Sequence, residues 1–538
     1  VPGCTVLAHD QQCAAEKRRD RKRGRLDTPK FRVVIDERVC EGCGDCGDTS
    51  NCLSVQPVQT PFGRKTRIDQ SSCNYDLSCM QGDCPAFMKV WVSDDAPRPV
   101  PAPPVGLPAP TLPDRTECTI RFSGIGGTGV VTTAQILGTA AMLEGLVVRG
   151  LDQTGLSQKA GPVVSDLRLS ADSARPSNRA TAGSVDVLVA FDQLVAGTEH
   201  TLRTLSGDRT VLVANTAAVP TGSMVTHPDR PYPAEEVTER LDESTRSHVR
   251  VDAGRLVHGM FGDDSTVNIF MIGVAVQAGR IPVSPQAIER AIELNGVAVK
   301  KNLAAFGWGR TWVVDASVVE RAAGTTVATD DAPLRDRLAA DLVGYQSSAY
   351  SARFLEVVDA VAAAGRPELT EAVARHLHKL MAYKDEYEVA RLLLLPESRE
   401  RVRRVGGDGA TVTWMLHPPA LSAIGVKEKI GLGRWARPLM YTLRAMRRLR
   451  GTPLDVFGVA KVRRIERAMV PEYIDAIRML LDHLDDSNVA EAVAIASLPD
   501  RVRGYERLKL ERATTYRAEL ERRVQAFTAK TVAGAAGR

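Results

Sequence analysis

The sequence lacks any apolar run long enough to cross a lipid bilayer, which needs about 18 consecutive apolar residues. Its longest clean apolar stretch, 267–278, ends after 12 residues. The N-terminal segment also lacks the order of a secretory signal, because its charge run at 16–25 follows a short apolar patch instead of preceding it. These absences predict a soluble, cytoplasmic protein with no membrane partner.

The chain has little charge of one sign in excess, since 70 Lys and Arg against 65 Asp and Glu leave a net charge of +5. A balance this small gives no reason to expect nucleic acid as a partner. The basic segment 17–23 could form a nucleic-acid arm, but a solvated helix leading out of a preceding domain is the favoured interpretation. With 44% hydrophobic and 25% charged residues, the 538 residues have ordinary globular composition.

Three catalytic signatures are absent. The sequence has no Gly-x-Ser-x-Gly elbow and no His-Glu-x-x-His pair, which excludes the hydrolases that use them. No lysine follows the glycine loop at 124–129, which excludes a P-loop nucleoside triphosphatase. No catalytic residue is therefore predicted in this chain.

The cysteines are clustered in the sequence. Seven of the ten lie in the segment from Cys40 to Cys84. A secreted disulfide framework would spread them along the chain. The triplet Cys40-x2-Cys43-x2-Cys46 can place three thiolates around a cubane, with Cys84-Pro85 as the remote fourth ligand. These four cysteines predict a [4Fe–4S] cluster, whereas zinc usually takes its ligands as two pairs.

A second cluster is less fully specified. Cys52, Cys73 and Cys79 supply three of the four ligands that it would need. Cys13, Cys118 or Asp76 could be the fourth, and a single cluster also remains open.

Composition divides the chain into several domains. Eight prolines between 96 and 113 predict an extended linker that reaches on the order of 50 Å at ~3.1 Å per residue. The alternating segments 31–35 and 90–92 predict the outer strands of a cysteine module at 29–95. Uniformly apolar segments with polar ends, at 186–192 and 210–216, predict a buried parallel sheet in an α/β domain at 114–328. After residue 329 the pattern predicts only helices.

The glycine loop at 124–129 follows a predicted strand and opens a helix. Its Gly-x-Gly-x-x-Gly spacing fits a dinucleotide fingerprint, and a helix N-terminus attracts phosphate. The acidic residue expected at the end of the second strand has no clear candidate, since only Arg149 and Asp152 stand near that point. A bound phosphate-bearing ligand and a tight structural turn both remain open for Gly124, Gly126, Gly127 and Gly129.

Taken together, these motifs resemble the C-terminal half of the fused bacterial indolepyruvate ferredoxin oxidoreductases, in the thiamine-dependent 2-oxoacid:ferredoxin oxidoreductase superfamily. The resemblance rests on the segments 9–14, 40–46, 72–85, 124–129, 155–161, 302–306, 457–458 and 496–504. It implies the tail of a thiamine diphosphate domain at 1–28, a ferredoxin-like iron–sulfur module at 29–95 and a gamma-type oxidoreductase domain at 114–328. A helical C-terminal domain at 329–538 completes the implied multidomain α/β plus α fold.

The resemblance also implies a function. The complete enzyme would decarboxylate an aryl 2-oxoacid oxidatively to an acyl-coenzyme A and pass electrons through [4Fe–4S] clusters to ferredoxin. The thiamine diphosphate site would lie upstream or in another chain, so this chain alone is expected to be inactive and to form part of an oligomer. Lys159 and Arg149 would contact coenzyme A phosphates. The alternatives are an iron–sulfur NAD(P)-dependent oxidoreductase subunit and a zinc-containing basic adaptor for nucleic acid.

Overall fold

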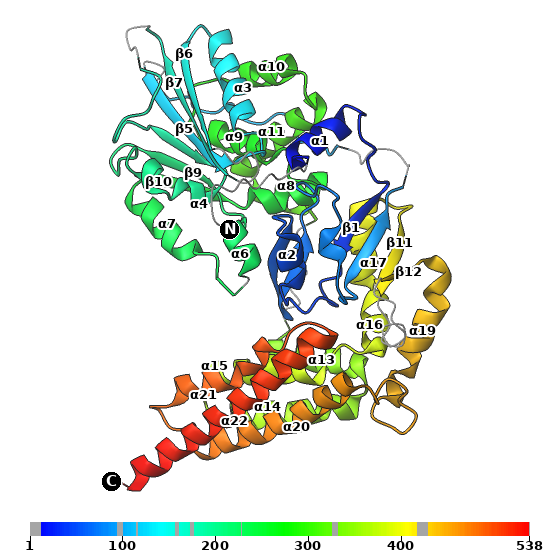
Figure 1. Cartoon of the computed structure of the whole chain (residues 1–538). Helices are drawn as coiled ribbons and strands as arrows, with labels where there is room; N and C mark the ends of the chain where they lie inside the picture. The colour runs from blue at the N-terminus through cyan, green and yellow to red at the C-terminus, as the bar shows by residue number, and fades with distance from the viewer. Residues whose placement is uncertain are drawn as a thin grey trace, which may run out of the picture.

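The computed structural model describes residues 12–93, 100–113, 117–155, 161–172, 177–227, 229–324, 332–416 and 429–536. The cysteine-rich segment lies between a larger α/β part and a mainly helical C-terminal part (Figure 1). Helix α1 (Ala14–Lys22) precedes this segment and contacts it, because Arg21 Nη1 donates to Asn74 O at 2.7 Å. None of the helices in these ranges combines the length and apolar character that a bilayer span requires.

The cysteine module contains two antiparallel strand pairs. Its elements are, in chain order, β1 (Phe31–Ile35), α2 (Asp45–Ser50), β2 (Val55–Thr60), β3 (Gly63–Ile68), η1 (Ser78–Met80) and β4 (Phe87–Trp91). Strand β1 pairs with β4, Phe31 opposite Trp91, and β2 pairs with β3 as a hairpin. The outer strands predicted from the alternating pattern are therefore the pair β1 and β4.

The sheet of this module continues into the C-terminal part. Strands β11 (Thr411–Leu416) and β12 (Ile430–Leu432) extend it to the order β1-β4-β11-β12, with every pair antiparallel. Trp91 Nε1 donates to Thr413 Oγ1 at 3.0 Å across the junction. The sequence predicted only helices after residue 329. Strands of six and three residues carry little periodic signal and form here because β4 pairs with β11 and β11 pairs with β12.

The α/β part is built on a six-stranded sheet of order β10-β9-β8-β5-β7-β6. Its strands are β5 (Glu117–Ile125), β6 (Val147–Thr154), β7 (Pro162–Ser170), β8 (Val187–Ala190), β9 (Val211–Asn215) and β10 (Ser247–Val251). Strands β5, β8, β9 and β10 are parallel, whereas β7 runs antiparallel to both β5 and β6. The parallel sheet predicted from sequence is thus a mixed sheet.

Helices cover both faces of this sheet. On one face they are α3 (Val130–Leu143), α9 (Val267–Gln277), α10 (Pro285–Asn295) and α11 (Val299–Val314). On the other face α4 (Gln193–Ala196) and α7 (Ala234–Glu243) pack against Leu188 and Leu212. The shorter helices are α5 (Glu199–Leu202), α6 (Gly222–Thr226), α8 (Ala253–Phe261) and α12 (Ala316–Ala322).

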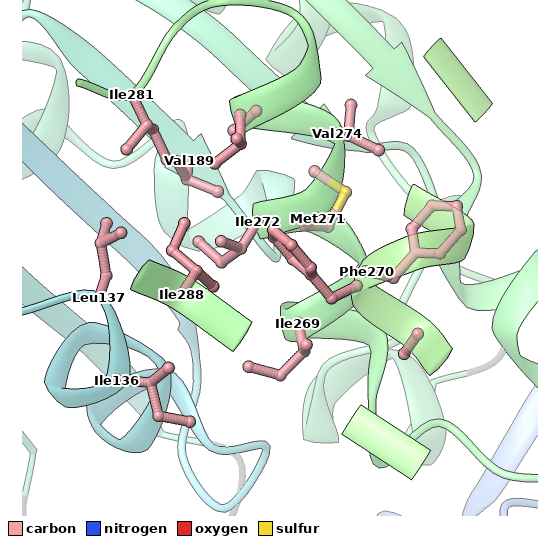
Figure 2. Close-up of a cluster of buried hydrophobic side chains, with 14 of the residues drawn as sticks. Ile136, Leu137, Val189, Ile269, Phe270, Met271, Ile272, Val274, Ile281 and Ile288 are labelled. Atoms are coloured by element: carbon pink, nitrogen blue, oxygen red, sulfur yellow. The ribbon is translucent and has the colours of Figure 1, made fainter. Parts of the chain in front are cut away.

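Helix α9 is the centre of the main core. Figure 2 shows Ile269, Phe270 and Ile272 of α9 among Ile136 and Leu137 of α3, Ile288 of α10 and Val189 of β8. All its residues from Val267 to Val276 are buried. A helix that is apolar on all sides is stable only inside a protein, which explains why its sequence is the longest apolar stretch in the chain.

Part of the proline-rich linker packs on this domain. Trp308 Nε1 donates to Pro101 O at 3.0 Å, and Gln277 Nε2 donates to Pro108 O at 2.9 Å. Segment 100–113 therefore lies along α9 and α11 instead of extending away from them.

The C-terminal part is mainly helical, as predicted. Its helices are α13 (Leu334–Tyr345), α14 (Ser348–Ala362), α15 (Pro367–Met381), α16 (Glu386–Leu393), α17 (Pro396–Gly406), η2 (Arg434–Ala436), α19 (Arg437–Ala445), η3 (Met446–Leu449), α20 (Lys461–Asp482), α21 (Val489–Ala496), η4 (Leu498–Arg501) and α22 (Glu506–Ala536). Its own core contains Phe354, Tyr473 and Tyr516, which are almost fully buried.

Helices α9 and α11 approach closely through two glycines. A Cβ atom on Gly309 would lie 2.0 Å from Phe270 O, and one on Gly273 would lie 2.2 Å from Phe306 O. We predict that Gly309→Ala lowers the free energy of unfolding by about 2–3 kcal/mol, because overpacking must separate the two helices. Chemical denaturation measures this change.

Gly150→Ala is the matched control, because its new methyl group would meet only atoms 3.9 and 4.0 Å away. Equal stability of the two variants would contradict close packing of α9 on α11.

Candidate functional site

Cys40 and Cys43 lie on the loop between β1 and α2, and Cys46 lies in the first turn of α2. Gly42 and Gly44 adopt positive φ angles of 61° and 88° in this loop, and Gly44 caps α2. Gly42 N donates to Cys40 Sγ at 3.2 Å. A Cβ atom on Gly42 would lie 2.3 Å from Arg64 O, so only glycine fits at this position.

The fourth predicted ligand lies with the triplet. Burial raises the pKa of the Cys46 thiol well above its ordinary value, and interactions with Cys40, Cys84 and Cys43 raise it further. Burial, followed by Cys40, likewise raises the pKa of Cys84. The chain fold therefore brings Cys40, Cys43, Cys46 and Cys84 together, although nearly forty residues separate the last two.

A second group forms around Cys79. Burial raises the pKa of its thiol to about 12, with contributions from Cys73, Cys52 and Asp76. Cys118 lies instead on β5 in the core of the α/β part, where burial and Asp186 raise its pKa. Cys13 is exposed before α1. Of the three candidate fourth ligands, only Asp76 interacts with this group among the interactions described.

Within the ranges that the structure describes, no three His, Cys, Asp or Glu side chains converge where one metal ion could be held. Zinc needs four donors at about 2.0–2.3 Å from one point. In a [4Fe–4S] cluster each thiolate binds a different iron, so the ligands surround the cubane instead of converging.

Lys429 provides a positive charge beside the same thiols. Burial lowers the pKa of Lys429, while Cys84 and Cys46 act in the opposite direction. Its Nζ is buried and makes no hydrogen bond with any described residue, although the ammonium lies 4.6 Å from the centre of the Phe87 ring. A buried cation without an acceptor suits a site that holds a negatively charged group.

The C-terminal part holds the cysteine loop through its backbone. Arg503 Nη1 donates to Glu41 O at 2.8 Å, and Tyr505 Oη donates to Val39 O at 2.6 Å. Arg512 Nη2 donates to Cys43 O at 3.2 Å. No sequence signal pointed to these residues, because more than 460 positions separate them from the carbonyls that they bind.

Glu41, in the same loop, is a buried carboxylate between lysines. Lys384 Nζ lies 3.2 Å from its Oε1, and Lys509 Nζ lies 3.7 Å from its Oε2. Burial alone would raise the pKa of Glu41, but Lys509 and Lys384 hold it well below its ordinary value. The charged form of Glu41 therefore joins the loop to α22 and to the segment before α16.

The glycine loop lies at the carboxyl end of β5, beside the end of β8. Gly127 and Gly129 have positive φ angles, and α3 begins after Gly129 with no side-chain cap. Gly126 N donates to Gly161 O at 2.7 Å, so this amide serves the structure of the loop. The uncapped first turn of α3 is the part of the motif suited to an anion.

Arg149 and Lys159 are the two predicted contacts to coenzyme A phosphates. Arg149 of β6 lies opposite Arg168 of β7. Arg168 in turn lies opposite Thr119 of β5, which is five residues before Gly124. At roughly 3.4 Å per residue this is about 17 Å from the glycine loop, so Arg149 does not lie at the glycine loop, and its contact with coenzyme A stays a prediction. Lys159 lies outside the described residues, although Gly161, two residues later, touches the loop.

Asp192 is a polar residue that sequence reasoning missed. It follows β8, and its backbone N–H donates to Ser123 O at 3.3 Å. Burial raises the pKa of Asp192, and its Oδ2 has no hydrogen-bond partner among the described residues. Its position at the edge where parallel strands end could have indicated it.

Comparison with known proteins identifies the α/β part. Residues 119–312 match the family described as pyruvate ferredoxin/flavodoxin oxidoreductase, and residues 332–522 match a family of unknown function, DUF6537. The common subunit gamma of pyruvate/ketoisovalerate oxidoreductases from Thermococcus litoralis is 30% identical over 185 residues, which cover 34% of this chain and 90% of that subunit. The chain belongs to the pyruvate ferredoxin/flavodoxin oxidoreductase family.

Two further proteins are similar to this chain. The indolepyruvate oxidoreductase subunit IorB of Pyrococcus horikoshii is 28% identical over 197 residues, which cover 36% of this chain and 94% of that subunit. The solved pyruvate oxidoreductase subunit PORC of Thermotoga maritima is 22% identical, covering 36% of this chain and 96% of that one, with a TM-score of 0.27. The superfamily predicted from the sequence is confirmed, and the chain is a subunit of a 2-oxoacid:ferredoxin oxidoreductase.

We predict that Arg503→Met lowers the free energy of unfolding by about 2–3 kcal/mol, because it leaves buried carbonyls of the cysteine loop without a donor. Chemical denaturation measures the loss, and amide hydrogen exchange in segment 39–43 should become faster. Arg501→Met is the control, because Arg501 is exposed only two residues away. Unchanged exchange in this segment would contradict the role assigned to Arg503.

Proposed function

We propose that this chain carries electrons from the 2-oxoacid site of the complete enzyme to ferredoxin, through [4Fe–4S] clusters held by its cysteine module. The gathering of seven cysteines into two groups within one small module carries this proposal. The order strand, helix, two strands, 3-10 turn and strand also agrees with a ferredoxin-like module. The clusters would supply one-electron transfer.

The first cluster would be held by Cys40, Cys43, Cys46 and Cys84. The Gly42 amide already donates to Cys40 Sγ, and hydrogen bonds to sulfur raise the reduction potential of such clusters. Lys429 would offset the negative charge that the cluster gains on reduction. Both groups favour a cluster that accepts electrons readily.

The second cluster would be held by Cys52, Cys73 and Cys79, with Asp76 as its fourth ligand. Asp76 Oδ1 accepts hydrogen bonds from Ser78 N at 3.0 Å and Ser78 Oγ at 2.8 Å. Both bonds hold its carboxylate beside Cys79. Cys46 interacts electrostatically with Cys79, so the two groups lie near enough for electrons to pass between clusters.

The substrate and the other parts of the enzyme are inferred from relatives. Three relatives named indolepyruvate oxidoreductase subunit IorB support an aryl 2-oxoacid such as indolepyruvate as the substrate class. Other relatives are named as gamma subunits, which supports assembly with further subunits. The complete enzyme would also need thiamine diphosphate and coenzyme A, and the first turn of α3 would bind a coenzyme A phosphate.

A dinucleotide function is less well supported. In a dinucleotide-binding fold, the second strand pairs directly with the first and ends in an acid that binds ribose. Here β7 separates β6 from β5, and Asp152 on β6 accepts a hydrogen bond from Ser165 Oγ at 2.6 Å. Asp152 is therefore engaged within the sheet.

We predict that the anaerobically reconstituted chain binds about eight irons, or about four if only the first cluster forms. Cys84→Ala should remove the first cluster as fully as Cys43→Ala does, because each thiolate is the only protein ligand of one iron. Iron analysis and electron paramagnetic resonance measure the loss. Cys79→Ala should remove only the second.

Cys118→Ala is the control, because it removes a buried thiol far from both groups. Full iron content in Cys84→Ala would sink the proposed ligand set. Stoichiometric zinc in place of iron would do the same.

A second prediction concerns turnover. The chain alone should not reduce a viologen dye when mixed with indolepyruvate, coenzyme A and thiamine diphosphate. Addition of its thiamine-binding portion should start the reaction, faster with indolepyruvate than with pyruvate or 2-oxoglutarate. Dye reduction by the isolated chain, or a preference for 2-oxoglutarate, would contradict the proposal.

A further inference from the structure

A large basic cavity lies where the three parts of the chain meet. Its volume is about 940 Å³, and its walls come from the β2–β3 hairpin, the segment 218–232 of the α/β part and helices of the C-terminal part. Nine of the lining side chains are Lys or Arg, against five Asp or Glu. A cavity of this size suits a small organic ligand, and its charge favours an anion.

Most of the cations in its wall already have carboxylate partners. Arg38 pairs with Asp341 at 2.7 Å, and Arg64 pairs with Asp229 at 2.6 Å. Lys384 pairs with Glu41 at 3.2 Å. These pairs involve three of the five acids in the wall, and the other two, Asp500 and Glu388, also pair with arginines. The wall therefore has a surplus of positive charge.

Lys65 is the most deeply buried of the cavity cations that lack a carboxylate partner among the described residues. Its side chain is 6% exposed and lines the cavity, yet no hydrogen bond or ion pair joins its Nζ to any described residue. Burying an ammonium ion without a partner is costly. Burial and the nearby Lys384 lower the pKa of Lys65 to about 7, whereas Glu41 and Cys40 act in the opposite direction.

Two further cations lack a carboxylate within the described part of the chain. Arg67 follows Lys65 by two positions on β3, so both project from the same face of the strand, and Arg67 is exposed at the edge of the cavity. Arg230, an exposed residue of the α/β part, donates from its guanidinium to Ser223 Oγ at 2.9 Å. Three unmatched cations exceed what one carboxylate could neutralise.

Part of the remaining wall is apolar. Phe62, Pro57 and Leu392 line it, and the Phe62 ring already stacks under the Arg38 guanidinium at 3.6 Å. A ligand with a doubly negative group and an organic body would pair with the basic residues and pack against the apolar ones. A phosphate ester carries about −1.5 to −2 charges at neutral pH, and lysine and arginine are its usual partners.

We propose that this cavity binds a phosphate-bearing small molecule, with Lys65, Arg67 and Arg230 as the phosphate contacts. The site is separate from the glycine loop. It joins the cysteine module to the α/β and C-terminal parts, so its ligand would stabilise their arrangement around the cysteine loop.

The test uses the full chain, titrated calorimetrically with ADP and, separately, with inorganic phosphate. We expect ADP to bind, and Lys65→Met to weaken binding by about tenfold or more, which corresponds to the loss of one charged hydrogen bond. Lys65→Arg should retain most of the affinity. Tighter binding of ADP than of inorganic phosphate would identify an organic phosphate, whereas equal binding would identify the free anion as the ligand.

Two controls separate this site from others. Lys300→Met removes an exposed lysine of α11, and Gly126→Ala alters the glycine loop; neither should change the binding. Lys65→Met removes an unpaired buried charge, so it should unfold at no lower temperature than the unaltered chain. ADP should raise the unfolding temperature of the unaltered chain but not that of the variant.

Failure of both probes to bind at millimolar concentration would overturn the proposal. So would equal ADP binding by Lys65→Met, or binding that is lost in Gly126→Ala and kept in Lys65→Met. If Lys65→Met does not fold, Arg230→Gln tests the same contact from the other wall, and unchanged ADP affinity there would overturn the proposal as well.

Discussion

The packing of the cysteine module against the C-terminal part depends on the buried carboxylate of Glu41. It lies in the middle of the cysteine triplet and is held by Lys384 and Lys509, both from the C-terminal part. Lys509 is shared with Glu466 at 2.7 Å. A buried charge is stable only when it is paired, so the cysteine loop and the helices around it must fold as one unit.

These contacts give the C-terminal part a structural role, although the family that residues 332–522 match has no known function. One of its faces supplies Arg503, Tyr505 and Arg512 to the backbone of the cysteine loop. Another supplies β11 to the sheet and Lys429 to the thiols. The cysteine module is therefore enclosed by segments that come more than 300 residues later in the chain.

The two places suited to phosphate differ in how they are built. At the glycine loop, backbone N–H groups at the start of α3 provide a partial positive charge. Asp192 lies nearby, and burial raises its pKa. In the basic cavity, side chains from separate parts of the chain provide full charges. The first kind is specified by a local motif. The second exists only after the parts have assembled.

The sequence by itself determined the features that depend on near neighbours in the chain. The cysteine spacing indicated which thiols belong together, the glycine spacing indicated a turn before a helix, and the apolar stretch at 267–278 indicated a core element. Tertiary structure alone decided the insertion of β7 between β5 and β6 and the pairing of β11 with β4. It also decided the ion pairs of Glu41 and the position of Lys65 in the cavity wall. These features join residues that are far apart in sequence, and pairing and burial at that range leave no periodic or local pattern to read.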